Sequence, residues 1–289
     1  MRDQATNLRA IVRDKYCRPS KASPGPRVIA VTSGKGGVGK TSLVVNLGIT
    51  LAKLNQRVAV FDADLGLANV DVLLGVNPPY NLYDVLYGEK TIRDIIVQGP
   101  HGINVVSGSS GIQELANLDR QGQERLIAAL SYFNENADFV LIDTGAGISR
   151  NVLGFVAAAE EVVVMVTPEP TSLTDAYSLV KVLATYKVHS SIDLVVNRAA
   201  DEQEAVNTAI KFMMVTNKFL QIKINHIGSV IEDRIVGQAV KSQAPFVILK
   251  PNSVAASNIL SIANTILGEQ NEQVKGMGSF LGKLFRLFR

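Results

Sequence analysis

Residues 27–55, RVIAVTSGKGGVGKTSLVVNLGITLAKLN, contain the pattern most informative about the fold class. Its first seven residues have the apolar content of a short buried strand, and the part from Lys40 onward places leucines at helical spacing. A glycine-rich loop that joins a strand to a helix and ends in Lys-Thr is the context of a phosphate-binding loop. Glycines let backbone N–H groups turn toward phosphate oxygens, and the start of the following helix adds positive partial charge. The residues expected to bind the phosphates are Gly34, Gly36, Gly37, Val38, Gly39, Lys40, Thr41 and Ser42.

This loop contains one lysine more than phosphate binding requires. The pattern Gly34-x-x-x-x-Gly39-Lys40-Thr41 is complete without Lys35. Lys40 is expected to reach the β- and γ-phosphates of a nucleotide, and the hydroxyl of Thr41 is expected to ligate Mg²⁺. Lys35 therefore needs a separate explanation.

Apolar runs and helical patterns alternate along the rest of the chain. Strands fit residues 27–33, 57–64, 103–107, 137–144, 161–167, 192–197 and 222–230, and helices fit 119–133, 171–187, 202–220 and 253–268. Continuously apolar strands, each followed by a helix, indicate a parallel sheet covered on both faces. The sequence predicts a single α/β domain of the P-loop NTPase class over 27–269, with a mostly parallel sheet. An N-terminal helix and linker (1–26) and a linker with a C-terminal amphipathic helix (270–289) are expected to flank it.

Three aspartates come directly after apolar strand runs. Asp62 and Asp64 end VAVFDAD, and Asp143 ends FVLID. Ligands of an open parallel sheet bind outside the carboxyl ends of its strands. A carboxylate there can hold a magnesium ion or its water, or orient an attacking water, although an acid after a strand is also a common turn residue. Three such acids around one phosphate loop favour the functional interpretation.

Composition and charge exclude several classes of protein. Of the 289 residues 47% are hydrophobic, and the net charge is +3. Residues 1–30 carry seven Arg/Lys and two Asp, and residues 275–289 carry four basic residues and no acid, which leaves the middle at −6. An acidic body is not typical of a protein that coats DNA, so nucleic acid is not an expected partner. Cys17 is the one cysteine in the sequence, which argues against a multi-cysteine metal site. The charged start and the lack of a long apolar run predict a cytoplasmic protein.

Three motifs resemble a known family. KGGVGKT (35–41) resembles the deviant Walker A motif of the MinD/ParA ATPases. DADLGLANVDVLLG (62–75) and NPPYNLYDVLYGE (77–89) are similar to the FlhG group within it, also called FleN or YlxH, whose members are MinD-like regulators of flagellar placement and number. The resemblance implies an ATPase that uses ATP and Mg²⁺ and forms a homodimer with ATP bound.

The same resemblance implies a role for each site residue. Lys35 would be the signature lysine, which reaches across the dimer interface to the partner's nucleotide, while Lys40 serves the phosphates of its own chain. Asp64 would orient the hydrolytic water, and Asp62 and Asp143 would be the acids on the magnesium side. Asn197, at the end of LVVN, matches the asparagine that reads adenine, although an asparagine at a strand end is also a common turn residue.

The C-terminal segment SFLGKLFRLFR has the pattern of a membrane-surface helix. Lys283, Arg286 and Arg289 lie on the face opposite to its apolar residues. It is therefore expected to target the ATP-bound dimer reversibly to the anionic inner surface of the cell membrane, since two copies bind more tightly than one. A terminal helix docked on the body is the alternative. The residues expected to contact the membrane are Phe280, Leu281, Leu284, Phe285 and Phe288.

The N-terminal segment DQATNLR (3–9) is similar to the activator motif with which FlhG proteins stimulate the GTPase FlhF. Asp3, Gln4, Leu8 and Arg9 are the residues expected to contact this partner, and flagellar C-ring components are further candidate partners. The residues alone indicate a short basic amphipathic helix on a flexible linker, which could equally dock on its own chain. A MinD-like division-site ATPase and a ParA-like DNA-partition ATPase are the rival functions.

Overall fold

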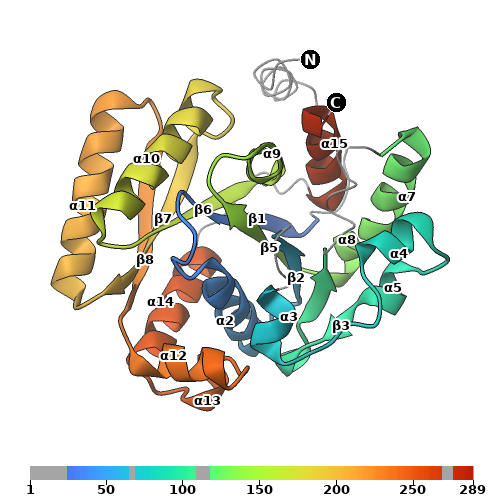
Figure 1. Ribbon diagram of the computed structural model, residues 1–289, viewed down its shortest axis with the longest axis horizontal. Helices are drawn as coiled ribbons and strands as arrows, with labels where there is room; N and C mark the ends of the chain where they lie inside the picture. Colours follow the sequence, from blue (N-terminus) through green and yellow to red (C-terminus); the bar gives the residue numbers. More distant parts are fainter. Residues whose placement is uncertain (1–24, 65–68, 109–117, 269–275, 289) are drawn as a thin grey trace.

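One sheet of eight strands runs through the molecule (Figure 1). The computed structural model describes residues 25–64, 69–108, 118–268 and 276–288, and the strand order there is β3-β4-β2-β5-β1-β6-β7-β8. The short edge strand β3 is antiparallel to β4, and all other neighbours are parallel. The strands are β1 Arg27–Ser33, β2 Val58–Ala63, β3 Val97–Gln98, β4 Asn104–Ser107, β5 Phe139–Ala146, β6 Glu161–Val166, β7 Ser191–Ala199 and β8 Lys223–Ile231.

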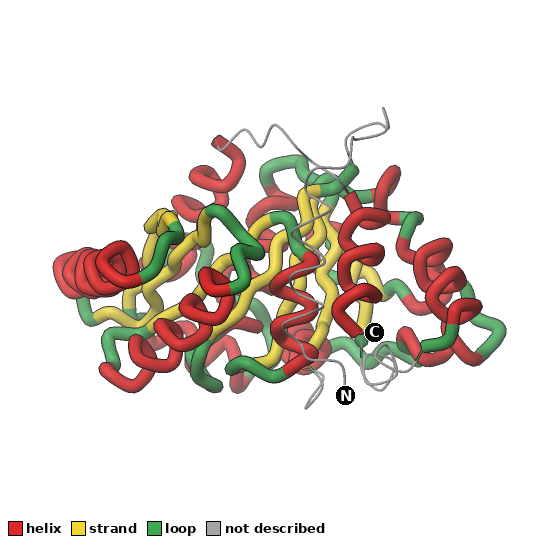
Figure 2. The backbone as a smooth tube through the Cα atoms, turned by 90° about the horizontal axis from the view of Figure 1, so that it is seen from above, coloured by secondary structure: helices red, strands yellow, loops and turns green. Residues whose placement is uncertain are grey.

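Helices cover both faces of this sheet (Figure 2). One face packs against α2 Lys40–Lys53, α3 Asn69–Leu74, α12 Arg234–Lys241, α13 Phe246–Leu249 and α14 Val254–Gly268. The other face packs against α4 Leu82–Tyr87, α5 Ile92–Ile95, α7 Arg120–Leu130, α8 Phe133–Asn136, α9 Arg150–Ala158, α10 Pro170–Thr185, α11 Glu202–Phe219 and α15 Gly276–Phe288. A 3₁₀ turn, η1 Pro100–Gly102, precedes β4. The predicted α/β domain with a mostly parallel sheet is confirmed.

Strand order places the aspartates beside the phosphate loop. Successive residues of a strand point to opposite faces, so Ile29 of β1 packs on the α2 side and Val28 on the α9 side. Strand β5 lies between β1 and β2, and Asp62 and Asp143 are opposite each other in the parallel register. The carboxyl ends of these strands therefore form one edge, where ligands of this architecture bind.

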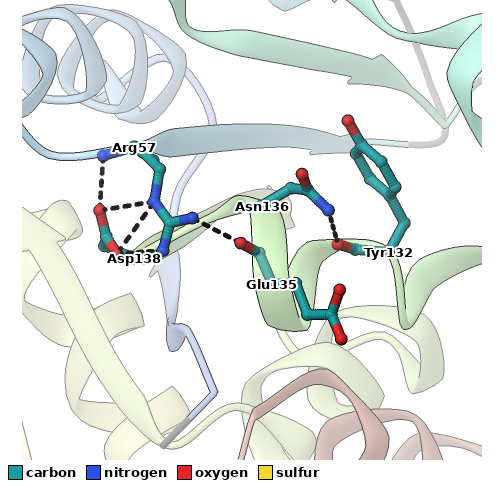
Figure 3. A network of polar contacts seen from close by, with 5 residues as sticks. All are labelled: Arg57, Tyr132, Glu135, Asn136 and Asp138. Atoms are coloured by element: carbon teal, nitrogen blue, oxygen red, sulfur yellow. Dashed lines mark hydrogen bonds and ion pairs between the residues drawn. The ribbon is translucent and has the colours of Figure 1, made fainter.

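At the N-terminal ends of the strands, on the side of the sheet away from the phosphate loop, an ion pair joins the starts of β2 and β5 (Figure 3). The backbone N–H of Arg57 donates to Asp138 Oδ2 at 2.8 Å, and its guanidinium lies 2.7 Å from Asp138 Oδ1. The guanidinium also donates to the carbonyl of Glu135. These hydrogen bonds from Arg57 hold the pKa of Asp138 below its usual range. The pair fixes β5 against β2 at the end far from the phosphate loop.

The C-terminal helix α15 packs on the body (Figure 1). Its apolar side fills the space between α7 and α9, and the rings of Phe280 and Phe155 stack with centroids 6.3 Å apart. Lys283 Nζ donates to the carbonyl of Ala158 at 3.3 Å. Among the described residues, no helix has the length and apolar content to cross a membrane. The members of the expected membrane face that pack here are Phe280, Leu281, Leu284 and Phe285, all at most 5% exposed.

The amphipathic helix expected in this tail is therefore present, and its apolar side is in the docked arrangement that the sequence left as the alternative. The side chain of Phe288 lies outside the described residues. The same holds for the N-terminal segment with Asp3, Gln4, Leu8 and Arg9. Membrane binding and partner binding by these tails stay predictions.

Candidate nucleotide site

The phosphate loop forms between β1 and α2, as the sequence predicts. Helix α2 begins at Lys40, directly after Gly39, which has a φ of 102°. Gly37 also has a positive φ, 75°, so both positions favour glycine. A Cβ on Gly34 would lie 2.1 Å from the carbonyl carbon of Asp175 in α10, closer than any side chain tolerates. Gly36 and Gly37 are exposed, so the top of the loop is accessible to a ligand.

Lys40 is buried at the base of the loop. Its Nζ donates to Ser33 Oγ at 3.0 Å, and Ser33 Oγ donates to the carbonyl of Lys35 at 2.7 Å. Burial lowers the pKa of Lys40, and the nearby charges of Asp143 and Asp64 oppose this shift. The structure therefore holds a cation in a poorly hydrated position beside exposed backbone N–H groups, which suits the phosphates of a nucleotide.

The predicted magnesium ligands lie together beside the loop. Thr41 Oγ1 donates to Asp143 Oδ2 at 2.6 Å, while Asp143 Oδ1 is buried without a hydrogen-bond partner in the described part of the chain. Backbone N–H groups of Asp64 and Val70 donate to Asp62 at 3.1 and 3.2 Å. Burial raises the pKa of both Asp62 and Asp143 to about 7.

These properties fit a magnesium ion. Mg²⁺ is usually held by one or two carboxylates together with phosphate and water, and Asp143 Oδ1 has no hydrogen-bond donor among the described residues. A divalent cation beside the two buried carboxyl groups would offset the burial that disfavours their charged forms. Thr41, Asp143 and Asp62 are the residues that could hold it.

Asp64 lies at the same end of the sheet, beside the last residues of β5. A Cβ on Gly145 would be 3.4 Å from Asp64 Oδ1. Asn69 Nδ2 is 3.5 Å from Asp64 Oδ2, at the limit of a hydrogen bond. The charge of Asp64 acts on Lys40, so Asp64 lies close to the predicted position of the terminal phosphate. Its role in orienting water stays a prediction.

The second lysine contacts a different element. Lys35 Nζ lies 2.7 Å from Glu169 Oε2 and 3.1 Å from Thr171 Oγ1, at the start of α10. The side chains of Lys35 and Glu169 are 41% and 56% exposed, so water competes strongly for this pair. The side chain of Lys35 is therefore directed to α10, and its hydrogen bonds within the described part of the chain do not involve Lys40. Its proposed function across a dimer interface is untested.

Sequence reasoning missed three residues of this site: Ser33, Glu169 and Thr171. A signal existed, because TPEPT directly follows an apolar strand and so reaches the same edge as the aspartates. Asn197, which sequence reasoning did include, is also in place. Its Nδ2 donates to the carbonyl of Val38 at 2.6 Å, although its role toward adenine stays a prediction.

Comparisons with known proteins agree with this geometry. A family model described as AAA domain matches residues 26–196. The chain is 42% identical over 240 residues to the antiactivator FleN of Pseudomonas aeruginosa, covering 83% of this chain and 86% of that protein. It is 30% identical over 299 residues to the flagellum site-determining protein YlxH of Helicobacter pylori, covering 99% of both.

Among solved structures, the MinD cell division protein of Aquifex aeolicus matches with a TM-score of 0.67 and 26% identity, over 85% of this chain and 98% of that chain. The family model covers more than half of the chain, and both curated relatives match over most of its length. The chain therefore belongs to the AAA-domain family and, within it, to the MinD/ParA-type ATPases of the FlhG (FleN, YlxH) group.

Proposed function

We propose that this chain hydrolyses ATP to ADP and phosphate with Mg²⁺, and that this reaction drives a monomer–dimer switch that regulates flagellar number or placement. The observation that carries the chemistry is the placement of Lys40 and the Thr41–Asp143 pair on one phosphate loop. The flagellar role is supported by the similarity to FleN and YlxH.

Each residue contributes a separate part of the reaction. The loop N–H groups and Lys40 bind the β- and γ-phosphates and offset the charge that the transition state spreads over the γ-phosphate oxygens. Mg²⁺ would supply further positive charge beside the phosphates, and Thr41, Asp143 and Asp62 would hold it. Asp64 orients the attacking water from the carboxyl end of β2.

Lys35 links this reaction to dimerisation. In the single chain, Lys35 is paired with Glu169, and the exposure of both side chains makes the pair easy to exchange. In the dimer, the Lys35 side chain would leave Glu169 and contact the nucleotide bound to the second protomer. Its positive charge would then lie beside the phosphates only when the dimer has formed. ATP would then stabilise the dimer, and hydrolysis would weaken it.

The tails would connect the switch to other components. The cytoplasmic monomer keeps α15 docked, and membrane association requires its apolar side to leave the groove between α7 and α9. The basic residues Lys283 and Arg286 favour an anionic surface. The segment 1–26 stimulates FlhF through Gln4 and its neighbours, and a flagellar C-ring component is a further candidate partner.

Nucleotide binding and oligomeric state test the proposal together. Wild type should hydrolyse ATP only with Mg²⁺ and should dimerise with ATP, as measured by phosphate release and by size exclusion with light scattering. Lys35→Ala should bind ATP but stay monomeric. Lys181→Ala, an exposed lysine farther along α10, is the matched control and should behave as wild type.

Two results would overturn parts of the proposal separately. Wild-type protein without Mg²⁺-dependent phosphate release contradicts the ATPase assignment. If Lys35→Ala dimerises at the same ATP concentration as wild type, Lys35 does not act on the nucleotide of the second protomer. The ATPase assignment would be unaffected.

A further inference from the structure

Strand β7 is irregular at the end that faces the phosphate loop. Its register with β8 shifts between Asn197 and Ala199, and Arg198 between them has a φ of 57°. A residue other than glycine seldom adopts this left-handed conformation, which costs free energy unless surrounding contacts enforce it. Bulges of this kind change the direction of a neighbouring side chain. The irregularity therefore raises the question of what Asn197 contacts.

Asn197 contacts the backbone of the phosphate loop. Its Nδ2 donates to the carbonyl of Val38 at 2.6 Å. A Cβ on Gly39 would lie 2.5 Å from the same nitrogen, so the amide lies directly against the loop. Because β6 lies between β1 and β7 in the sheet, Asn197 reaches past the end of a strand to make this contact.

We propose that Asn197 is a positioning residue for the phosphate loop, acting through the hydrogen bond from Nδ2 to the Val38 carbonyl. This inference rests on the proposed nucleotide site and is separate from any contact of Asn197 with the base. In the described part of the chain no hydrogen bond uses the Oδ1 of Asn197, so that atom stays available to a ligand.

The composition of the loop explains why a tether is useful. Gly34, Gly36, Gly37 and Gly39 allow the loop many conformations, and only some of them direct the N–H groups at one phosphate. Ordering such a loop costs conformational entropy at the moment of binding. A hydrogen bond from Asn197 to the centre of the loop reduces this cost before the ligand arrives. Val38 is 3% exposed, so water has little access to it. If Asn197 were replaced, the Val38 carbonyl would lose its hydrogen-bond donor and water could not easily replace it.

Loop positioning and adenine recognition by Asn197 predict different affinities for a ligand that has no base. Mg²⁺–pyrophosphate has phosphates but no adenine, so a residue that only reads adenine does not affect its binding. Titration calorimetry should show that Asn197→Ala binds Mg²⁺–pyrophosphate about three- to tenfold more weakly than wild type, the range expected for one hydrogen bond. ATP binding should weaken at least as much.

Asn136→Ala is the matched control. Asn136 Nδ2 also donates to a backbone carbonyl, that of Tyr132 at 2.7 Å, near the opposite edge of the sheet (Figure 3). This variant removes the same chemical group and should bind Mg²⁺–pyrophosphate as wild type does.

Amide hydrogen exchange of nucleotide-free protein gives a readout that needs no ligand. The N–H groups of residues 35–39 should exchange faster in Asn197→Ala, and also in Asn197→Asp, which keeps the side-chain shape but lacks the donor. The rest of the protein should exchange as in wild type, which shows that both variants fold.

The inference would be overturned if Asn197→Ala bound ATP more weakly but kept the wild-type affinity for pyrophosphate and the wild-type exchange of the loop. Recognition of the adenine base would then be the role of Asn197. If wild type binds neither ATP nor pyrophosphate, the proposed function fails. Loop exchange in the variants would still decide whether Asn197 tethers the loop.

Discussion

Replacing Leu281 with alanine tests whether α15 belongs to the folded core. Leu281 is 1% exposed and lies in the apolar cluster that includes Phe61, Ile142 and Phe155. Truncation of a buried leucine removes its burial energy and leaves a cavity, which together cost about 2–5 kcal/mol in protein cores. A helix that served only the membrane would be solvated in the free protein, and the same change would then cost within about 0.5 kcal/mol.

The two expectations differ enough for a simple measurement. Urea unfolding followed by circular dichroism gives the free energy of unfolding of wild type and of Leu281→Ala without nucleotide or lipid. Thermal unfolding should agree, since each 1 kcal/mol shifts the midpoint by about 2–4 °C in a domain of this size. Ser279→Ala, a partly exposed position of the same helix, is the control and should change little.

A loss below about 0.5 kcal/mol for Leu281→Ala would refute the docked arrangement. A larger loss has a practical consequence for deletion experiments. Removal of residues 276–289 would uncover the groove and destabilise the domain, so loss of membrane binding in such a truncation would not by itself identify a membrane helix.

Four further substitutions test the site and the opposite edge of the sheet. Lys40→Ala should abolish ATP binding, measured by calorimetry, because the loop loses the cation that faces the phosphates, while the melting temperature without nucleotide shows whether the variant is folded. Asp64→Ala should still bind ATP but lose phosphate release and accumulate as a dimer; a monomer under these conditions would indicate a structural role. Gly34→Ala should weaken ATP binding and destabilise the protein by about 1–3 kcal/mol, because the new Cβ collides with the backbone of Asp175. Asp138→Asn should lose less stability in acid than wild type does. Arg57 lowers the pKa of Asp138 in the folded state, so this carboxylate stabilises the protein above its unfolded pKa near 3.8. That stabilisation disappears as the pH falls through the pKa of the folded state. Urea unfolding between pH 6 and pH 2 measures this, and an unchanged acid limb would contradict it.

The central strands could be predicted because their residues form continuous apolar runs. β1 has the predicted bounds, and β5 ends two residues later than expected, at Ala146. The edge strand β3 has two residues, too few to give a pattern. The phosphate loop and Asp62 and Asp143 could likewise be placed, since parallel strands bring their carboxyl ends to one edge.

Two features depend on packing that the sequence does not encode locally. An apolar helix face suits a bilayer and a sheet equally well, so the pattern of Phe280 and Leu284 could not distinguish them. The pairing of Lys35 with Glu169 joins residues 134 positions apart and depends on where α10 begins. Neither arrangement has a signal in local periodicity.

The docked helix α15 packs on two strands that also carry the predicted magnesium ligands. Phe61 and Ile142 line the groove under α15, and each is followed in its strand by a carboxylate of the site, Asp62 or Asp143. If ligand binding moves the end of either strand, the surface of Phe61 and Ile142 against which α15 packs would therefore change. If ATP changes the affinity of this protein for vesicles by some factor, thermodynamic reciprocity requires vesicles to change its affinity for ATP by the same factor. The lipid surface would then act on the nucleotide site as an effector, through strands that it never contacts.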